Sequence, residues 1–179
     1  MATGFEVNDS RSEVVAIATE LVGSDCIRYV PGHPELGQSK DGGFDCSGFV
    51  SYVLRESGLI IPDYISHTGE VRPIRHTNEF FDHYGIAIHK QFALPGDLIF
   101  FSKHGWTPSH IGLMISPNHF VHAPGHDGEK VLIESIESIA ITPKSKNGHR
   151  IIYDHNPIGF KSLVIPHDDP SYRVHQRAL

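Results

Sequence analysis

The hydrophobic pattern of this chain changes character partway along, and that change limits the folds open to it. In the first third, apolar residues recur at helical spacings of three and four. From residue 92 onward the pattern becomes short β-type runs separated by turn residues, at residues 98–101, 111–115, 120–122, 131–134 and 163–165. Helices first and strands later, within 179 residues, predict an α+β domain whose helices pack on one side of an antiparallel sheet.

Two helices are expected before the strands. A capping-box pattern at residues 10–13 predicts that the first helix begins there and runs to about Leu21. A Gly/Pro-rich loop is expected over residues 32–43. Asp45 is a suitable N-cap for a second helix that ends near Gly58. This second helix would hold Cys46 in its first turn.

Composition limits the class of protein and its partners. The length fits one domain, which we expect over residues 1–165, followed by a polar arm or tail at 166–179. The net charge of −6, with no extended basic block, argues against a nucleic-acid partner. No apolar run reaches the roughly 20 residues that span a bilayer. Two cysteines are too few for a disulfide framework.

The start of the chain bears on its location. Residues 1–13 carry acidic side chains and have no basic region followed by an apolar one, as a secretory signal would. We therefore expect a cytoplasmic protein, or one exported without a classical signal peptide, as a phage lysin or a delivered toxin would be.

Cys46 is the first candidate for chemistry. A thiol in the first turn of a helix lies beside free backbone N–H groups and the positive end of the helix dipole, and both favour the thiolate. The small residues Ser47 and Gly48 would let a substrate carbonyl approach backbone donors that could form an oxyanion hole. The plain alternative is a buried, inert packing cysteine, which is how Cys26 is interpreted.

Two histidines are candidates for a base. If residues 111, 113 and 115 face the core, then His110 and Gly112 face the other way, because side chains alternate along a strand. A three-residue connection at 116–118 would place Gly112 opposite His122 and make His110 the diagonal neighbour of His122. One histidine would take the thiol proton and the other would orient it. For each histidine alone, an exposed surface residue is the alternative.

Four motifs in a fixed order resemble one family, the NlpC-type papain-like peptidases that cleave peptidoglycan stem peptides. They are Asp-Cys-Ser-Gly-Phe-Val at residues 45–50, Pro-Gly-Asp-Leu-Ile-Phe-Phe at 95–101, His-Ile-Gly-Leu at 110–113 and Val-His-Ala-Pro at 121–124. The resemblance implies a papain-like fold with Cys46 as nucleophile, His110 as base and His122 as orienting residue. It implies a γ-D-glutamyl to diamino acid bond as the target, in a stem peptide or muropeptide, and no cofactor.

The resemblance also implies substrate contacts. Tyr29 is similar to a family tyrosine that lines the cleft beside the thiol, and Asp45 to a residue that receives the free amine of the stem peptide. Ser47 follows the nucleophile, and Ser66 matches a further position near the amine. The family's Leu-Pro-Arg-Thr-Ser stretch is replaced by Ile-Pro-Asp-Tyr-Ile-Ser at residues 61–66.

Three rival interpretations remain. Cys46, His110 and His122 could bind zinc with a fourth ligand, for which His104, His119 and His126 are candidates, although the paired spacings of zinc sites are missing. The chain could be a non-catalytic wall-binding domain that keeps the fold. It could also hydrolyse another amide or isopeptide bond.

Asp97, in a Pro-Gly-Asp turn, is expected to bind backbone N–H groups rather than act as acid or base.

Overall fold

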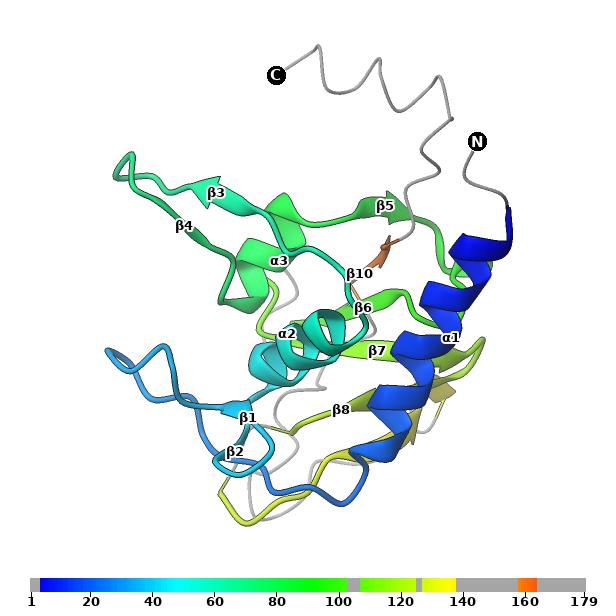
Figure 1. Ribbon diagram of the computed structural model, residues 1–179, viewed down its shortest axis with the longest axis horizontal. Coiled ribbons are helices and arrows are strands. Elements are labelled where there is room, and N and C mark those ends of the chain that lie inside the picture. The colour runs from blue at the N-terminus through cyan, green and yellow to red at the C-terminus, as the bar shows by residue number, and fades with distance from the viewer. Residues whose placement is uncertain (1–3, 103–106, 125–126, 138–157, 164–179) are drawn as a thin grey trace.

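The computed structural model describes residues 4–102, 107–124, 127–137 and 158–163, with side chains described from Ser10 onward (Figure 1). The predicted arm at 166–179 lies outside these residues and stays a prediction. The helices are α1 (Gly4–Glu20), α2 (Cys46–Glu56), α3 (Thr77–His83) and the short 3₁₀ turn η1 (Lys90–Phe92).

An antiparallel six-stranded sheet forms the body of the domain, with strand order β5-β10-β6-β7-β8-β9. Its strands are β5 (Ile86–Ile88), β6 (Leu98–Phe101), β7 (His110–Ser116), β8 (His119–His122), β9 (Leu132–Ser135) and β10 (Gly159–Ser162). Two small hairpins lie outside it, formed by β1 (Gln38–Ser39) with β2 (Gly43–Phe44), and by β3 (Asp63–Ile65) with β4 (Val71–Pro73). The predicted α+β fold is confirmed.

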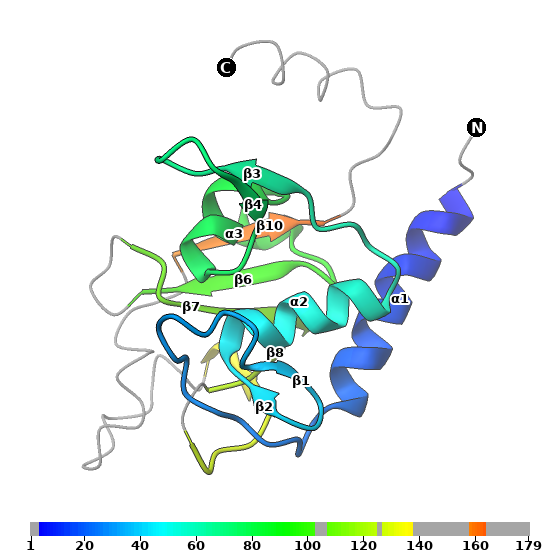
Figure 2. The ribbon, with the colours of Figure 1, turned by 60° about the vertical axis from the view of Figure 1, so that its left-hand side comes forward.

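Helices α1 and α2 contact β7 and lie over one face of the sheet (Figures 1 and 2). The main core fills the space between them, where Phe49 and Val53 of α2 meet Ile111 and Leu113 of β7. The opposite face is also buried, by a second apolar cluster that includes Phe101, Met114 and Phe120. The centre of the sheet face that points away from α1 and α2 is therefore also buried. His110 and His122 lie on this face.

The hairpin of β7 and β8 has the predicted register. Leu113 pairs with Val121 and Met114 with Phe120, which places Gly112 beside His122. The connection differs from the prediction, because Ser116 pairs with His119 and only two residues turn the chain. An irregularity between Met114 and Ser116 adds one residue to β7 and compensates for the shorter loop.

Three boundaries differ from the sequence-based expectations. Ser10 lies inside α1, which begins by Gly4 rather than at the capping-box pattern, because serine and glutamate also fit helix interiors. The last strand among the described residues is Gly159–Ser162, and residues 164 and 165 of the strand predicted at 163–165 lie outside them. The loop at 32–43 contains strand β1 and the start of β2. In contrast, α2 begins at Cys46 as predicted, and Gly58 follows it with a φ of +73°.

A buried ion pair attaches α1 to the sheet. The guanidinium of Arg11 lies 2.8 Å from the Asp97 carboxylate, which has no exposed surface, and also donates to the carbonyl of Pro95. Asp97 accepts from the backbone N–H of Leu94 at 2.7 Å, as predicted for a turn aspartate. Among the residues described, no helix is long and apolar enough to cross a membrane.

Candidate active site

Asp45 and α2 position the thiol of Cys46. The Asp45 side chain caps the helix by accepting from the backbone N–H of Gly48 at 2.8 Å, and its own N–H bonds to the carbonyl of Gly37 at 3.0 Å. Cys46 is therefore the first helical residue, as predicted, and it is partly exposed. Cys26, by comparison, is buried in the core at 2% exposure.

At Gly48, the first turn of α2 is covered by the preceding loop. A Cβ on Gly48 would lie 2.7 Å from the carbonyl carbon of Gly37 and closer still to its oxygen. Gly48 is therefore small because the loop backbone packs on it. The expectation that Gly48 admits a substrate carbonyl is wrong, since the Gly37 backbone occupies that space.

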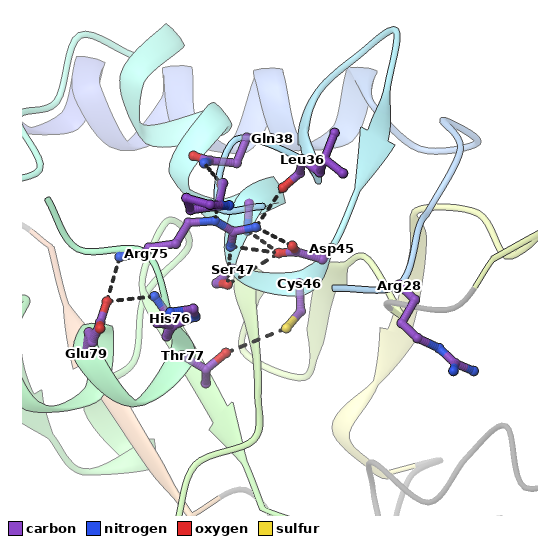
Figure 3. Close-up of polar contacts among 12 residues, drawn as sticks. Arg28, Leu36, Gln38, Asp45, Cys46, Ser47, Arg75, His76, Thr77 and Glu79 are labelled. Carbon is purple, nitrogen blue, oxygen red and sulfur yellow. Dashed lines mark hydrogen bonds and ion pairs between the residues drawn. The ribbon is translucent and has the colours of Figure 1, made fainter. Parts of the chain in front are cut away.

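A buried arginine, Arg75, joins the loop to the helix start (Figure 3). It forms an ion pair with Asp45, with Nη1 3.1 Å from Oδ1, and donates to Ser47 Oγ at 3.0 Å. It also donates to the backbone carbonyls of Pro34 and Leu36 at 2.7 Å each. Asp45 and Ser47, predicted as substrate-binding residues, therefore lie beside the thiol and are both engaged by Arg75.

The other predicted substrate residues take different places. The ring of Tyr29 lies 5.4 Å from the guanidinium carbon of Arg75 and meets His76 edge-on at a centroid distance of 5.1 Å. The structure thus places Tyr29 against Arg75, the arginine that pairs with Asp45. Ser66 lies in the β3–β4 turn, where its hydroxyl bonds to Thr68 at 2.7 Å and accepts from the backbone N–H of Glu70 at 3.2 Å.

The environment of the thiol opposes its ionisation. Burial raises the pKa of Cys46, and the negative charge of Asp45 raises it further. The Thr77 hydroxyl, 3.6 Å from Sγ, and the backbone N–H groups of Ser47 and Ile111 lower this pKa. The expected helix-start thiolate is thus opposed by the packing around the sulfur. Ionisation of this thiol would need a base, and the contact with the backbone N–H of Ile111 places the sulfur beside the strand residue that follows His110.

The Thr77→Val variant tests this hydrogen bond. Because the hydroxyl stabilises the thiolate, its removal should raise the pKa of Cys46 further. The pH dependence of iodoacetamide alkylation, measured by mass spectrometry on the peptide that contains Cys46, should therefore shift upward. Thr68→Val, in the β3–β4 turn, is the matched control and should leave the midpoint unchanged. Equal midpoints for both variants would contradict the assignment.

His110, His122 and Glu134 form a row across three strands. His110 Nε2 lies 2.9 Å from His122 Nδ1, with the rings perpendicular at a centroid distance of 4.9 Å. His122 Nε2 in turn lies 3.3 Å from the carboxylate of Glu134. His110 and His122 are 1% and 0% exposed, so the alternative of surface histidines is wrong.

Gly112 allows the two histidines to approach each other. A Cβ at this position would lie 2.9 Å from the carbonyl oxygen of Val121 and 3.2 Å from the Cβ of His122. The predicted role of Gly112, leaving room beside His122, is therefore confirmed by the packing.

The zinc interpretation gains no support from the described residues. Within them, no group of three or more His, Cys, Asp and Glu side chains is arranged to hold a metal ion. His119 bonds to Ser116 Oγ at 3.0 Å, at the turn of the hairpin. The other candidate fourth ligands, His104 and His126, lie outside the described residues.

Sequence reasoning missed Arg75, Thr77 and Glu134. Arg75 and Thr77 follow a three-residue strand, where no periodic pattern marks their position. Glu134 could have been found, because residues 131–134 were predicted to be a strand and Glu134 continues the diagonal of His110 and His122 across the sheet.

Together, these features define a class: a papain-like α+β fold in which a cysteine at a helix start faces a histidine-bearing antiparallel sheet. The NlpC/P60 family profile matches residues 32–156, which is more than half of the chain. The chain belongs to the NlpC/P60 family. The NlpC/p60 domain of the peptidoglycan hydrolase SagA has a solved structure that matches with a TM-score of 0.55 at 25% identity, over 85% of this chain and 97% of that one.

Two similar curated proteins carry names of peptidoglycan or murein enzymes, and a third is named a glutamyl hydrolase. The probable peptidoglycan endopeptidase LytE of Bacillus subtilis is 30% identical over 67% of this chain and 29% of its own length. The murein DD-endopeptidase MepS of Escherichia coli is 36% identical over 56% of this chain and 46% of its own length. The γ-DL-glutamyl hydrolase of B. subtilis is 27% identical over 69% of this chain and 26% of its own length. The chain thus spans less than half of each relative.

Proposed function

We propose that this protein is a cysteine peptidase that hydrolyses an amide bond in peptidoglycan stem peptides. One observation carries the proposal: the thiol of Cys46 contacts the backbone N–H of Ile111, next to His110, whose ring bonds to that of His122. A nucleophile, a base and an orienting group on rigid elements are what nucleophilic amide hydrolysis requires.

The first half of the reaction forms a thioester. His110 Nε2 bonds to His122, and Nδ1 is the ring nitrogen that we propose takes the thiol proton. The sulfur attacks the amide carbonyl, and the negative charge moves to the carbonyl oxygen. In the first turn of α2 the N–H of Gly48 is bound by Asp45, so the N–H of Cys46 is the proposed donor to this oxyanion.

The second half releases both products. His110 returns its proton to the leaving amine as the carbon–nitrogen bond breaks, and the acyl group stays on Cys46 as a thioester. Water then attacks the thioester carbonyl with His110 as base. The second product leaves as a carboxylic acid, and the thiol is restored. No metal or cofactor enters these steps.

The proposed site for the stem peptide is the cluster of Arg75 with Tyr29, Asp45 and Ser47. Tyr29, Asp45 and Ser47 contact Arg75, and Asp45 and Ser47 flank Cys46 in the chain. Both carboxylate oxygens of Asp45 already contact protein donors, so a substrate amine would share this carboxylate with Arg75. Ser66, engaged within its own turn, stays a prediction.

The proposed bond joins the γ-carboxyl of D-glutamate to the diamino acid. The name of one relative, a γ-DL-glutamyl hydrolase, supports this choice, whereas MepS is named a DD-endopeptidase. The two bonds yield different products, since cleavage at the first leaves a free glutamyl carboxylate and cleavage at the second leaves a free D-alanine carboxylate.

Digestion of purified peptidoglycan tests the proposal. The wild-type protein should release fragments that end in D-glutamate and fragments that begin with the diamino acid, identified by mass spectrometry. Iodoacetamide should stop the release, and a metal chelator should leave it unchanged. No new fragment, or release that a chelator stops and iodoacetamide does not, would overturn the proposal.

A further inference from the structure

Glu134 continues the row of the two histidines on the same face of the sheet. His122 of β8 pairs with Leu132 of β9, and Phe120 pairs with Glu134. Glu134 is therefore the diagonal neighbour of His122, as His110 is on the other side. The contacts follow this diagonal, at 2.9 Å from His110 Nε2 to His122 Nδ1 and 3.3 Å from His122 Nε2 to Glu134.

The row is largely buried, and aromatic rings pack against it. The ring of Phe120 lies 5.0 Å from that of His122, and the ring of Phe101 lies 6.0 Å from that of His110. The side chain of Glu134 is 13% exposed and that of His122 is 1% exposed. Electrostatic contacts in such an environment are stronger than the same contacts in water. At the start of α2, the described charged and titratable groups include Cys46, Asp45, Arg75 and His76.

We propose that Glu134 is a positioning residue that fixes the tautomers of His122 and His110, and thereby keeps His110 Nδ1 unprotonated toward Cys46. This inference rests on the proposed cysteine peptidase function. It adds a carboxylate behind the orienting histidine, so that proton transfer depends on a residue that touches neither the thiol nor the substrate.

The hydrogen bond between the two histidines and the charge contact between His122 and Glu134 together give this order. An ionised carboxylate only accepts, so the proton of neutral His122 belongs on Nε2, facing Glu134. His122 Nδ1 then carries a lone pair and accepts from His110 Nε2–H. His110 Nδ1 is left with a lone pair, which is the state that a base needs. When His110 takes the thiol proton, the negative charge of Glu134 stabilises the positive charge on the pair.

Histidine tautomers can be measured without any substrate. In ¹⁵N-labelled wild-type protein near neutral pH, imidazole nitrogen shifts should show both His110 and His122 with the proton on Nε2. Glu134→Leu removes the acceptor, so His122 should lose this preference. Glu137→Gln, at an exposed carboxylate three residues further along the chain, is the matched control and should keep both tautomers. Unchanged tautomers in Glu134→Leu would overturn the inference.

Kinetics provide a second readout. Glu134→Leu should lower kcat by roughly 10- to 100-fold with KM unchanged, the usual range for a residue that orients a functional histidine. Glu134→Gln keeps the shape and loses the charge. Because removal of a negative charge makes nearby protons easier to lose, the basic limb of its kcat/KM profile should move down by about 1 pH unit. An unshifted basic limb, or a rise in KM alone, would contradict the proposed role.

The two proposals fail separately. If the wild-type protein cleaves no peptidoglycan but the tautomers depend on Glu134 as described, the substrate assignment falls and the role of Glu134 in ordering the histidines holds. If cleavage occurs and Glu134→Leu matches the wild type in tautomers and kcat, the role of Glu134 falls and the proposed function holds.

Discussion

The Cys46→Ala variant should lose amide hydrolysis by roughly 10⁴-fold or more while it folds like the wild type. Removal of the nucleophile removes the covalent route altogether, and what remains comes from binding and the oxyanion donor. The side chain is small and partly exposed, so alanine costs little packing. Initial rates on soluble muropeptides, with thermal unfolding measured in parallel, give both quantities.

The chain provides a matched control in its second cysteine. Cys26→Ala should keep full activity per folded molecule and lose stability, because Cys26 is buried in the main core at 2% exposure. Activity that survives in Cys46→Ala and disappears in Cys26→Ala would show that the wrong thiol has been assigned. Activity in neither the wild type nor Cys26→Ala would favour the non-catalytic wall-binding interpretation.

The Gly48→Ala variant should be destabilised by at least about 3 kcal/mol, at the upper end of overpacking effects. The added methyl group meets the backbone of Gly37, which cannot rotate away as a side chain would. For a chain of this size the melting temperature should fall by roughly 6–12 °C. Thermal unfolding followed by circular dichroism measures the change.

Gly42→Ala is the matched control for this packing. A methyl group at Gly42 meets only the hydroxyl of Ser39, at the end of a side chain that can rotate. Its melting temperature should stay within about 2 °C of the wild type, which corresponds to less than 1 kcal/mol. Equal melting temperatures for Gly48→Ala and the wild type would show that the loop does not pack on the helix start.

The parts of the fold that could be predicted are those with long periodic patterns or strong caps. The buried apolar face of α2 and its Asp45 cap follow from helical periodicity and capping preferences. The β7–β8 register follows from the alternation of side chains along strands. The α3 helix, β3, β4 and β5 were missed, because a helix of two turns and strands of three residues are too short to show a period. The Ser-x-x-Glu pattern misplaced the start of α1, since the same residues occur within helices.

In the candidate site too, features set by local sequence patterns could be predicted, and features set by long-range packing could not. The histidine pair was predictable because it depends on strand alternation, which is local. The burial of the pair was not, because it depends on the second apolar cluster, whose members come from separate strands and loops. Arg75 is 30 residues from Asp45 in the chain, and no local pattern connects them. The location of the protein, cytoplasmic or exported without a classical signal, stays a prediction.

The most direct test of the central claim is the mass of the protein during turnover. Wild-type protein mixed with a muropeptide and quenched in acid should carry an adduct equal to the acyl half of the substrate, bound to the peptide that contains Cys46. The adduct should be absent from Cys46→Ala. An acyl adduct on any other residue, or hydrolysis at the wild-type rate by Cys46→Ala, would contradict the account.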